Sequence, residues 1–337
     1  MLGSLRFFLA LFVVIGHLTE GVHFFSHWGV FAVFGFYVIS GYLITLILNE
    51  IYSFRLSAFV FNRFLRLFPI YYVVATATLI ALTLSSGANT FHAAWTIQTR
   101  WMDIFGNFLI IPFEFYDSSF RLVPPTWSVA VELVNYLILW LIVARSRTLT
   151  FLIFSIVCLY HISSLFGGAD WGRRYSPYYA ALLPFSAGSL LYFFKDSVDA
   201  IHPQWRTYIS KISFASWLIN LILCGFIGGL GGKFFNWFFY VNLLSLTAFL
   251  YLNLPSSEST PTRWWDKKLG DLAYPIFLTH WIVGYAVSQL LLDGQRRGII
   301  LFATSVIPII AISYALSKIA DSMIEPLRAQ VRNKVKR

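Results

Sequence analysis

Apolar stretches of membrane-spanning length recur along the whole 337-residue sequence. About 20 predominantly apolar residues cross the hydrocarbon core of a bilayer as a helix, and several runs here reach or approach that length. Hydrophobic residues make up 58% of the chain and charged residues 12%, which excludes an ordinary soluble globular protein. We therefore predict an all-α polytopic integral membrane protein with about ten transmembrane helices. The expected spans are 4–19, 28–48, 67–84, 126–144, 149–166, 177–194, 211–230, 234–252, 272–292 and 299–320.

The distribution of lysine and arginine predicts the orientation of these spans. Sixteen of the 25 lie in loops or ends on one side of the predicted membrane and seven on the other. By the positive-inside rule both termini are cytoplasmic, in a multi-pass protein of the cell membrane, with the bacterial inner membrane as the expected location. We expect a membrane domain over residues 1–325 and a basic cytoplasmic tail over 326–337 that contacts anionic lipids. The apolar stretch 101–113 is too short to span and is expected to be re-entrant or interfacial.

Two ionisable residues stand within the first apolar stretch, LRFFLALFVVIGHL. Eleven residues separate Arg6 from His17, so a helix places both on one face, roughly 16 Å apart along its axis. Ionisable groups at membrane depth are costly unless they face a protein interior or a water-filled cavity. Two interpretations are open: Arg6 is an interfacial anchor and His17 a hydrogen-bonded residue at the outer end, or both belong to a functional site.

An arginine pair precedes the third span, in NEIYSFRLSAFVFNRFLRLF at 49–68. Arg63 and Arg66 are spaced i, i+3 and share one face of a helix that connects the second and third spans. They are either positive-inside residues of an amphipathic helix or a clamp for phosphate groups at the cytosolic face.

Two later spans carry one ionisable residue each. Glu132 follows the sequence VPPTW and lies on the same helix face as Ser128. It needs a partner, for which a structural salt bridge is one option and the first span the better candidate. His280, in DLAYPIFLTHWIV, is either a hydrogen-bonded core histidine or a site residue in the outer half of the ninth span.

Taken in order, these motifs resemble the membrane acyltransferase 3 family, which transfers acyl groups from acyl-CoA, commonly onto carbohydrate hydroxyls. LRFFLALFVVIGH is similar to its first-span signature and GFYVISGYLIT, with Ser40 and Gly41, to its second-span element. NRFLRLFPIYY carries the Arg-x-x-Arg pair, and PTWSVAVE and AYPIFLTHW resemble the later Trp-Ser…Glu and Tyr…His elements. MIEPLR matches the closing Glu-x-Pro pattern loosely. Gly3 stands where family members often have an acidic residue, three positions before the first arginine.

The resemblance implies an acyltransferase, most simply an O-acetyltransferase, that uses acetyl-CoA and a carbohydrate acceptor, which can be lipid-linked. His17 is the expected base and Glu132 the carboxylate that orients it. Both direct transfer and a transient acyl-histidine remain open. Arg63 and Arg66, with Arg6 deeper along the donor path, are expected to bind coenzyme A. The remaining expected lining residues of the substrate site are Ser128, Ser40, Trp127 and His280.

Other functions remain as alternatives. Intramembrane Arg, Glu and His residues also describe a proton-coupled transporter, although the sequence lacks the paired broken helices of that class. An acyltransferase with a lipid or small-molecule acceptor, or a flipping or sensory protein, is also compatible. No metal is expected, since no acidic or cysteine ligand accompanies His17, His23 and His27. Nucleic acid is not an expected partner, because no binding motif accompanies the positive charge.

Overall fold

A computed structural model describes the chain except residues 20, 86, 98–99, 255–263, 295–297 and 337. The described residues form helices and turns, without a strand. The helices are α1 (Leu2–Leu18), α2 (Trp28–Ile47), α3 (Leu56–Leu84), α4 (Trp101–Leu109), α5 (Thr126–Leu141), α6 (Arg147–Phe166), α7 (Tyr178–Phe193), α8 (Pro203–Phe226), α9 (Phe235–Asn253), α10 (Trp264–Leu291), α11 (Ile299–Met323) and α12 (Glu325–Lys336).

Each of the ten predicted spans overlaps one long helix, from α1 to α3 and from α5 to α11. Six helical segments are long and apolar enough to cross a membrane: His23–Tyr52, which contains α2, and the helices α3, α6, α8, α9 and α11. α1 and α5 are shorter apolar helices. This is the fold of a multi-pass membrane protein, while ten spans and two cytoplasmic termini stay predictions. Arg263, Arg296, Arg297 and Arg337, which entered the orientation count, lie outside the described residues.

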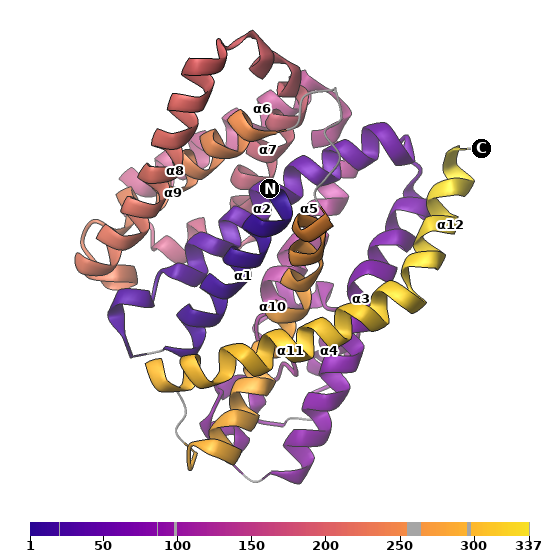
Figure 1. The fold of residues 1–337 in the computed structure, drawn as a ribbon, viewed down its shortest axis with the longest axis vertical. Helices are drawn as coiled ribbons and strands as arrows, with labels where there is room; N and C mark the ends of the chain where they lie inside the picture. Colours follow the sequence, from indigo (N-terminus) through magenta and orange to yellow (C-terminus); the bar gives the residue numbers. More distant parts are fainter. Residues whose placement is uncertain (20, 86, 98–99, 255–263, 295–297, 337) are drawn as a thin grey trace.

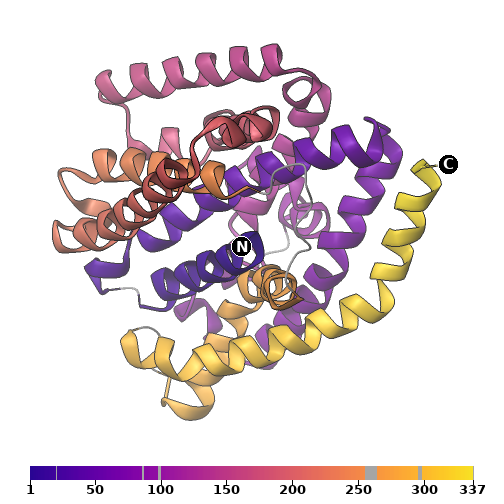
Figure 2. The same ribbon diagram turned by 45° about the horizontal axis from the view of Figure 1, so that its top comes forward.

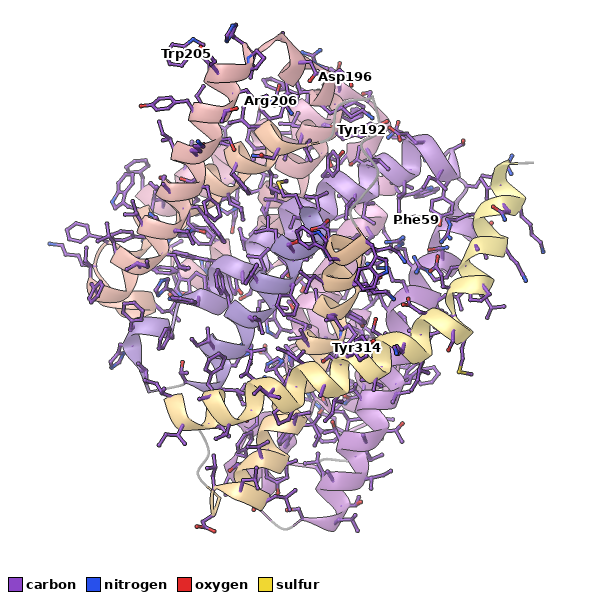
Figure 3. The ribbon with its side chains drawn as sticks, in the orientation of Figure 1. Phe59, Tyr192, Asp196, Trp205, Arg206 and Tyr314 are labelled. Atoms are coloured by element: carbon purple, nitrogen blue, oxygen red, sulfur yellow. The ribbon has the colours of Figure 1, made fainter. Side chains whose placement is uncertain are left out.

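Large apolar side chains cover much of the outer surface. Trp205 on α8 is 62% exposed at the edge of the molecule, whereas Phe59 on α3 is fully buried (Figure 3). α4 follows the same pattern within the segment predicted to be interfacial, because Trp101 and Phe108 are exposed while Asp103 is buried. A periphery rich in large apolar side chains is the arrangement that a lipid environment favours.

The first helix lies at the centre of the bundle. α1 packs between α2 and α10, and α11 packs against α10 and also contacts α1 (Figures 1 and 2). α8 and α9 form a pair on one side of this centre, and α12 runs along α3 on the other. The residues of α1 are therefore surrounded by elements from both ends of the chain.

The crossing of α1 and α10 depends on two glycines. A Cβ atom at Gly3 would lie 1.8 Å from the carbonyl oxygen of Asp266, and one at Gly270 would lie 2.8 Å from Cα of Gly3. The close approach lets the Asp266 carboxylate accept hydrogen bonds from the backbone N–H groups of Gly3 and Ser4, at 3.2 and 2.8 Å. An acidic group thus caps α1 from a distant helix, next to Gly3, where the chain itself lacks the acidic residue that the resemblance led us to expect.

A second glycine crossing fixes α2 against α7. A Cβ atom at Gly41 would lie 2.1 Å from the carbonyl oxygen of Phe185, and one at Gly188 would lie 2.0 Å from that of Val38. Small residues allow this backbone contact, as they do between membrane helices generally. The two residues of the Ser40–Gly41 pair therefore have different roles. Gly41 packs against α7, and Ser40 faces the interior cavity described below.

α3 begins eleven residues earlier than the predicted third span. The chain reverses after a π-helical turn, η2 (Leu48–Tyr52), through positive φ angles of 46° at Ser53 and 58° at Phe54. α3 then runs without a break from Leu56 through Pro69. The predicted separation of a connecting helix from the span is wrong, and Arg63 and Arg66 lie on the span-forming helix itself.

Candidate active site

A cavity of about 490 Å³ lies between α1, α2, α3, α5, α10 and α12. Val33 and Ile47, which both line it, are fourteen residues apart on α2, so the cavity extends roughly 21 Å along that helix. The end near Val33, Phe36 and Phe277 is apolar. The ionisable side chains that line the cavity are Arg6, Tyr37, Tyr52, Arg63, Arg66, Glu132, Tyr136, Asp266, Lys267, Asp271, Tyr274, Arg328 and Arg332.

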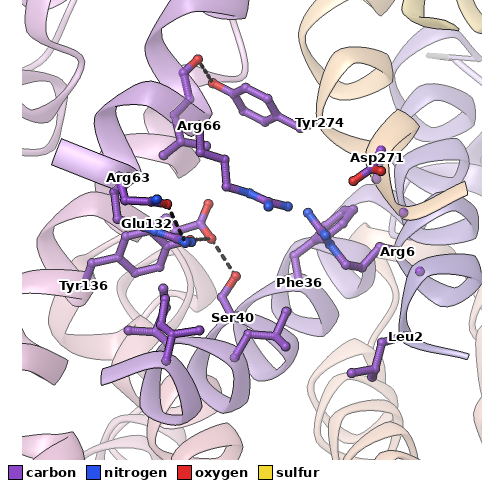
Figure 4. A pocket seen from close by; sticks show the side chains of 18 of the residues that line it. Leu2, Arg6, Phe36, Ser40, Arg63, Arg66, Glu132, Tyr136, Asp271 and Tyr274 are labelled. Atoms are coloured by element: carbon purple, nitrogen blue, oxygen red, sulfur yellow. Dashed lines mark hydrogen bonds between the residues drawn. The ribbon is translucent and has the colours of Figure 1, made fainter. Parts of the chain in front are cut away.

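Three arginines predicted to bind the donor converge on this cavity. Figure 4 shows Arg6 from α1 and Arg66 from α3 pointing toward each other, with Arg63 beside Glu132. Arg6 and Arg66 make no hydrogen bond or ion pair within the part of the chain that the structure describes. Arg63 makes a long contact, 3.5 Å from Nη2 to Oδ1 of Asn62, and also interacts with the Tyr52 hydroxyl, while its buried Nε has no partner among the described residues. Under-satisfied guanidinium groups that face one cavity make a site for an anion.

Glu132 lies on the opposite wall and is held by two hydroxyl groups. Its Oε1 accepts a hydrogen bond of 2.6 Å from Ser40 on α2 and another from Tyr136, one turn further along α5. The predicted partnership of Glu132 with His17 is wrong, since these two hydroxyls make its hydrogen bonds among the described residues. The carboxylate instead supplies negative charge beside the arginines.

His17 and His280 form a hydrogen-bonded pair at the other end of α1. Nδ1 of His17 lies 2.9 Å from Nε2 of His280, and the rings stack with centroids 5.1 Å apart. Nδ1 of His280 lies 2.9 Å from the carbonyl oxygen of Phe277, which can only accept a hydrogen bond. A neutral His280 therefore donates from Nδ1 and accepts at Nε2, so Nδ1 of His17 is the donor within the pair.

The histidine pair stands next to the cavity, beyond its apolar end. Neither ring is among the lining residues, whereas Phe277, whose carbonyl group binds His280, is one of them. On α2, Gly29 lies beside Nε2 of His17 and Val33 lines the cavity one turn away. Arg6 in the cavity and His17 beyond it are thus about three turns apart along α1.

The remaining predicted lining residues differ in their surroundings. Ser40 and Ser128 both line the cavity, but the Ser40 hydroxyl donates to Glu132 and that of Ser128 to the carbonyl oxygen of Pro125. Trp127 packs against Tyr175, with ring centroids 5.3 Å apart, and lies outside the cavity lining. Trp127 is therefore a packing residue of this arrangement.

The segment predicted to be a basic tail is the helix α12, and it contributes to the site. α12 packs against α3 and η2, and Arg328 and Arg332 line the cavity. Sequence analysis missed both residues as site candidates. Their i, i+4 spacing after Glu325–Pro326 was the available signal, since it places them on one face of a helix that a proline can start.

The comparison with known families agrees with this geometry. A family model described as an acyltransferase domain, that of acyltransferase 3, matches residues 2–318, nearly the whole chain. The chain belongs to the acyltransferase 3 family. No curated protein and no solved structure matches it significantly. The family match covers the arginine pair, Glu132 and both histidines, and it ends before α12.

Membership of this family supports a membrane acyltransferase. The described residues contain no group of three or more His, Cys, Asp or Glu side chains that could hold a metal ion. The groups that line or adjoin the cavity are arginines, a carboxylate held by hydroxyls, and a histidine pair.

Proposed function

We propose that this protein transfers an acyl group, most simply acetyl, from acyl-CoA to a hydroxyl of a cell-envelope carbohydrate. The observation that carries the proposal is the placement, at two levels of α1, of an arginine-lined cavity and of a histidine whose Nδ1 is hydrogen-bonded to His280. The first feature suits a polyphosphate and the second suits the activation of a hydroxyl group.

The spacing of these two features fits the donor. About twelve bonds separate the diphosphate of coenzyme A from its thiol sulfur, which at about 1.2 Å per bond of extended chain is roughly 14 Å. Arg6 and His17 are roughly 16 Å apart along α1. A donor whose diphosphate is bound by Arg6, Arg63 and Arg66 would reach the neighbourhood of His17 with its thioester. The apolar lining at Val33, Phe36 and Phe277 suits the acyl end of such a molecule.

In this proposal His17 is the general base. Its Nε2 takes the proton from the acceptor hydroxyl while the oxygen attacks the thioester carbonyl carbon. When the tetrahedral intermediate collapses, the C–S bond breaks and the imidazolium returns the proton to the leaving thiolate. An acyl-histidine route uses the same nitrogen as nucleophile and remains the alternative. His280 accepts the hydrogen bond from Nδ1 of His17 and so fixes the tautomer of His17, as the carboxylate does in hydrolytic triads.

Glu132 has an electrostatic role in this scheme. Its charge offsets part of the arginine cluster, and its hydrogen bonds with Ser40 and Tyr136 hold it in place. The negative charge of Glu132 reduces the mutual repulsion of the arginine side chains before an anionic donor binds.

The acceptor is proposed from the family's chemistry, and a lipid or small-molecule hydroxyl is the competing choice. Purified protein in lipid nanodiscs, given radiolabelled acetyl-CoA and either a polysaccharide, a lipid-linked sugar or a simple alcohol, should label the carbohydrate. Labelled product from the alcohol or lipid alone would replace the carbohydrate acceptor. Coenzyme A binding without any transfer would support the flipping or sensory alternative.

A further inference from the structure

The C-terminal helix closes the cavity end that lies farthest from the histidines. α12 packs against η2 and the beginning of α3, while Val33 and Phe277 line the opposite end. Asn62 of α3, fully buried, holds Arg328 at both ends: its Nδ2 donates to the arginine carbonyl at 3.3 Å, and its Oδ1 accepts from Nε at 3.3 Å. Arg328 is thereby fixed beside Arg63 and Arg66.

One carboxylate serves both arginines of α12. Nη1 of Arg328 lies 2.6 Å from Oε2 of Glu325, and Nη2 of Arg332 lies 2.7 Å from Oε1. These contacts leave the other Nη group of each arginine without a hydrogen bond among the described residues, on side chains that line the cavity. A shared carboxylate neutralises one of the two charges, so the pair keeps an excess positive charge at the cavity mouth.

Positive charge is crowded at this mouth. Burial, followed by the charge of Arg66, lowers the pKa of Arg328 to about 10. Burial alone would raise the pKa of Glu325, but the hydrogen bond from Arg332 and the charges of both arginines hold it below its ordinary value. Like charges held together in a part-buried site are stabilised when an anion binds between them.

We propose that Arg328 and Arg332 bind the terminal phosphomonoester on the ribose of coenzyme A, and so make the enzyme select coenzyme A over its 3′-dephospho form. The inference rests on the proposed function, because it assumes a donor with its thioester toward His17. In that orientation the nucleotide end stays at the mouth, where α12 lies. A phosphomonoester carries about 1.5 to 2 negative charges at pH 7 and accepts several hydrogen bonds, which suits two guanidinium groups one turn apart.

Affinities for coenzyme A and dephospho-coenzyme A test the proposal, measured by calorimetry on the full-length protein in nanodiscs. The wild type should bind coenzyme A about tenfold or more tightly than the dephospho form, as expected for charged hydrogen bonds. Arg332→Gln and Arg328→Gln should lose most of this preference with little change for the dephospho form. Lys334→Gln is the matched control, since it removes a charge from an exposed position of the same helix. Arg63→Gln should weaken the binding of both ligands.

The outcomes separate the two proposals. Equal affinity of the wild type for the two ligands, or an unchanged preference in both α12 variants, would overturn the inference and leave the proposed donor standing. A parallel loss of both ligands in Arg332→Gln would assign α12 a purely structural role. A wild-type protein that binds neither ligand would refute the acyl-CoA donor itself. If Arg328→Gln fails to fold, Arg332 decides the question, since Glu325 is its single hydrogen-bond partner among the described residues.

Discussion

Nδ1 of His17 and Nε2 of His280 lie 2.9 Å apart, which joins the first helix to the tenth through two imidazole rings. The carbonyl group of Phe277 fixes the far nitrogen of His280 as a donor, and this fixes the protonated nitrogen of His17 in turn. A histidine whose tautomer is set by its neighbour presents the same nitrogen in every turnover. His280 is therefore a positioning residue in the proposed reaction.

Replacement of His280 should lower turnover while leaving donor affinity unchanged. His280→Ala removes the acceptor for the Nδ1 proton of His17, so both tautomers become populated and turnover should fall about tenfold to a hundredfold. His280→Gln offers an amide oxygen in place of Nε2 and should recover part of the rate. Single-turnover transfer and coenzyme A titration measure the two effects. Equal losses in both variants, together with lost donor binding, would indicate a packing role.

The arginine pair of α3 should control donor affinity. Arg63→Ala and Arg66→Ala each remove a guanidinium group that lacks a carboxylate partner among the described residues. The stability of the folded protein should therefore change little. The loss of a charged hydrogen bond should weaken coenzyme A binding about tenfold to a hundredfold. Lysine at either position should restore part of the affinity because it keeps the charge without the planar fork. Unchanged affinity in both alanine variants would show that the two arginines serve only as positive-inside residues that set the membrane orientation.

Gly41 should be required for the packing that positions Ser40. Gly41→Ala places a Cβ atom against the α7 backbone, and such overpacking costs roughly 1–3 kcal/mol. Gly231→Ala is the control, because a Cβ atom there meets nothing within 4 Å. The midpoint of thermal unfolding in detergent should fall for the first variant and stay near the wild-type value for the second. Equal midpoints would show that the α2–α7 crossing relaxes easily.

Glu114, in the loop before α5, should make stability depend on pH. Burial raises its pKa to about 7, against a hydrogen bond of 2.8 Å from the N–H of Tyr178. The folded state then holds a proton that the unfolded state has lost above its ordinary pKa of 4.5, so this contribution to stability disappears as the pH rises from about 4.5 to about 7. Glu114→Gln should flatten that part of the profile, whereas Asp117→Asn, at an exposed position of the same loop, should not. Parallel profiles for Glu114→Gln and the wild type would contradict the shift.

Sequence patterns predicted the features that depend on local periodicity, namely the helices and the residues that share a helix face. Apolar runs located the ten long helices of the described residues, and the i, i+3 spacing of Arg63 and Arg66 placed both on one face of α3. The partner of Glu132 could not be predicted, because it depends on which helix α2 approaches. That choice is made by the backbone contact of Gly41 with α7, a tertiary feature.

The role of α12 was hidden for a related reason. A short, strongly basic segment after the last span is typical of a lipid-facing tail. Nothing local indicates that buried Asn62, 266 residues earlier, holds Arg328. Likewise Gly3 breaks the family pattern in the sequence, and only the fold reveals that Asp266 comes to the same place.

Acyl transfer by a His17→Ala protein is the most direct measure of the proposed chemistry. Removal of a general base typically costs ~10²–10⁴ in rate. Labelled acetyl transfer should therefore fall to near background. Coenzyme A affinity should stay close to wild type, because Arg6 lies roughly 16 Å from His17 along α1 and the other arginines line the cavity, which His17 does not. Glu132→Gln provides the comparison, since the loss of its charge should change donor affinity as well as rate. A well-folded His17→Ala protein that transfers acetyl groups at the wild-type rate would contradict the assignment of His17 as the base.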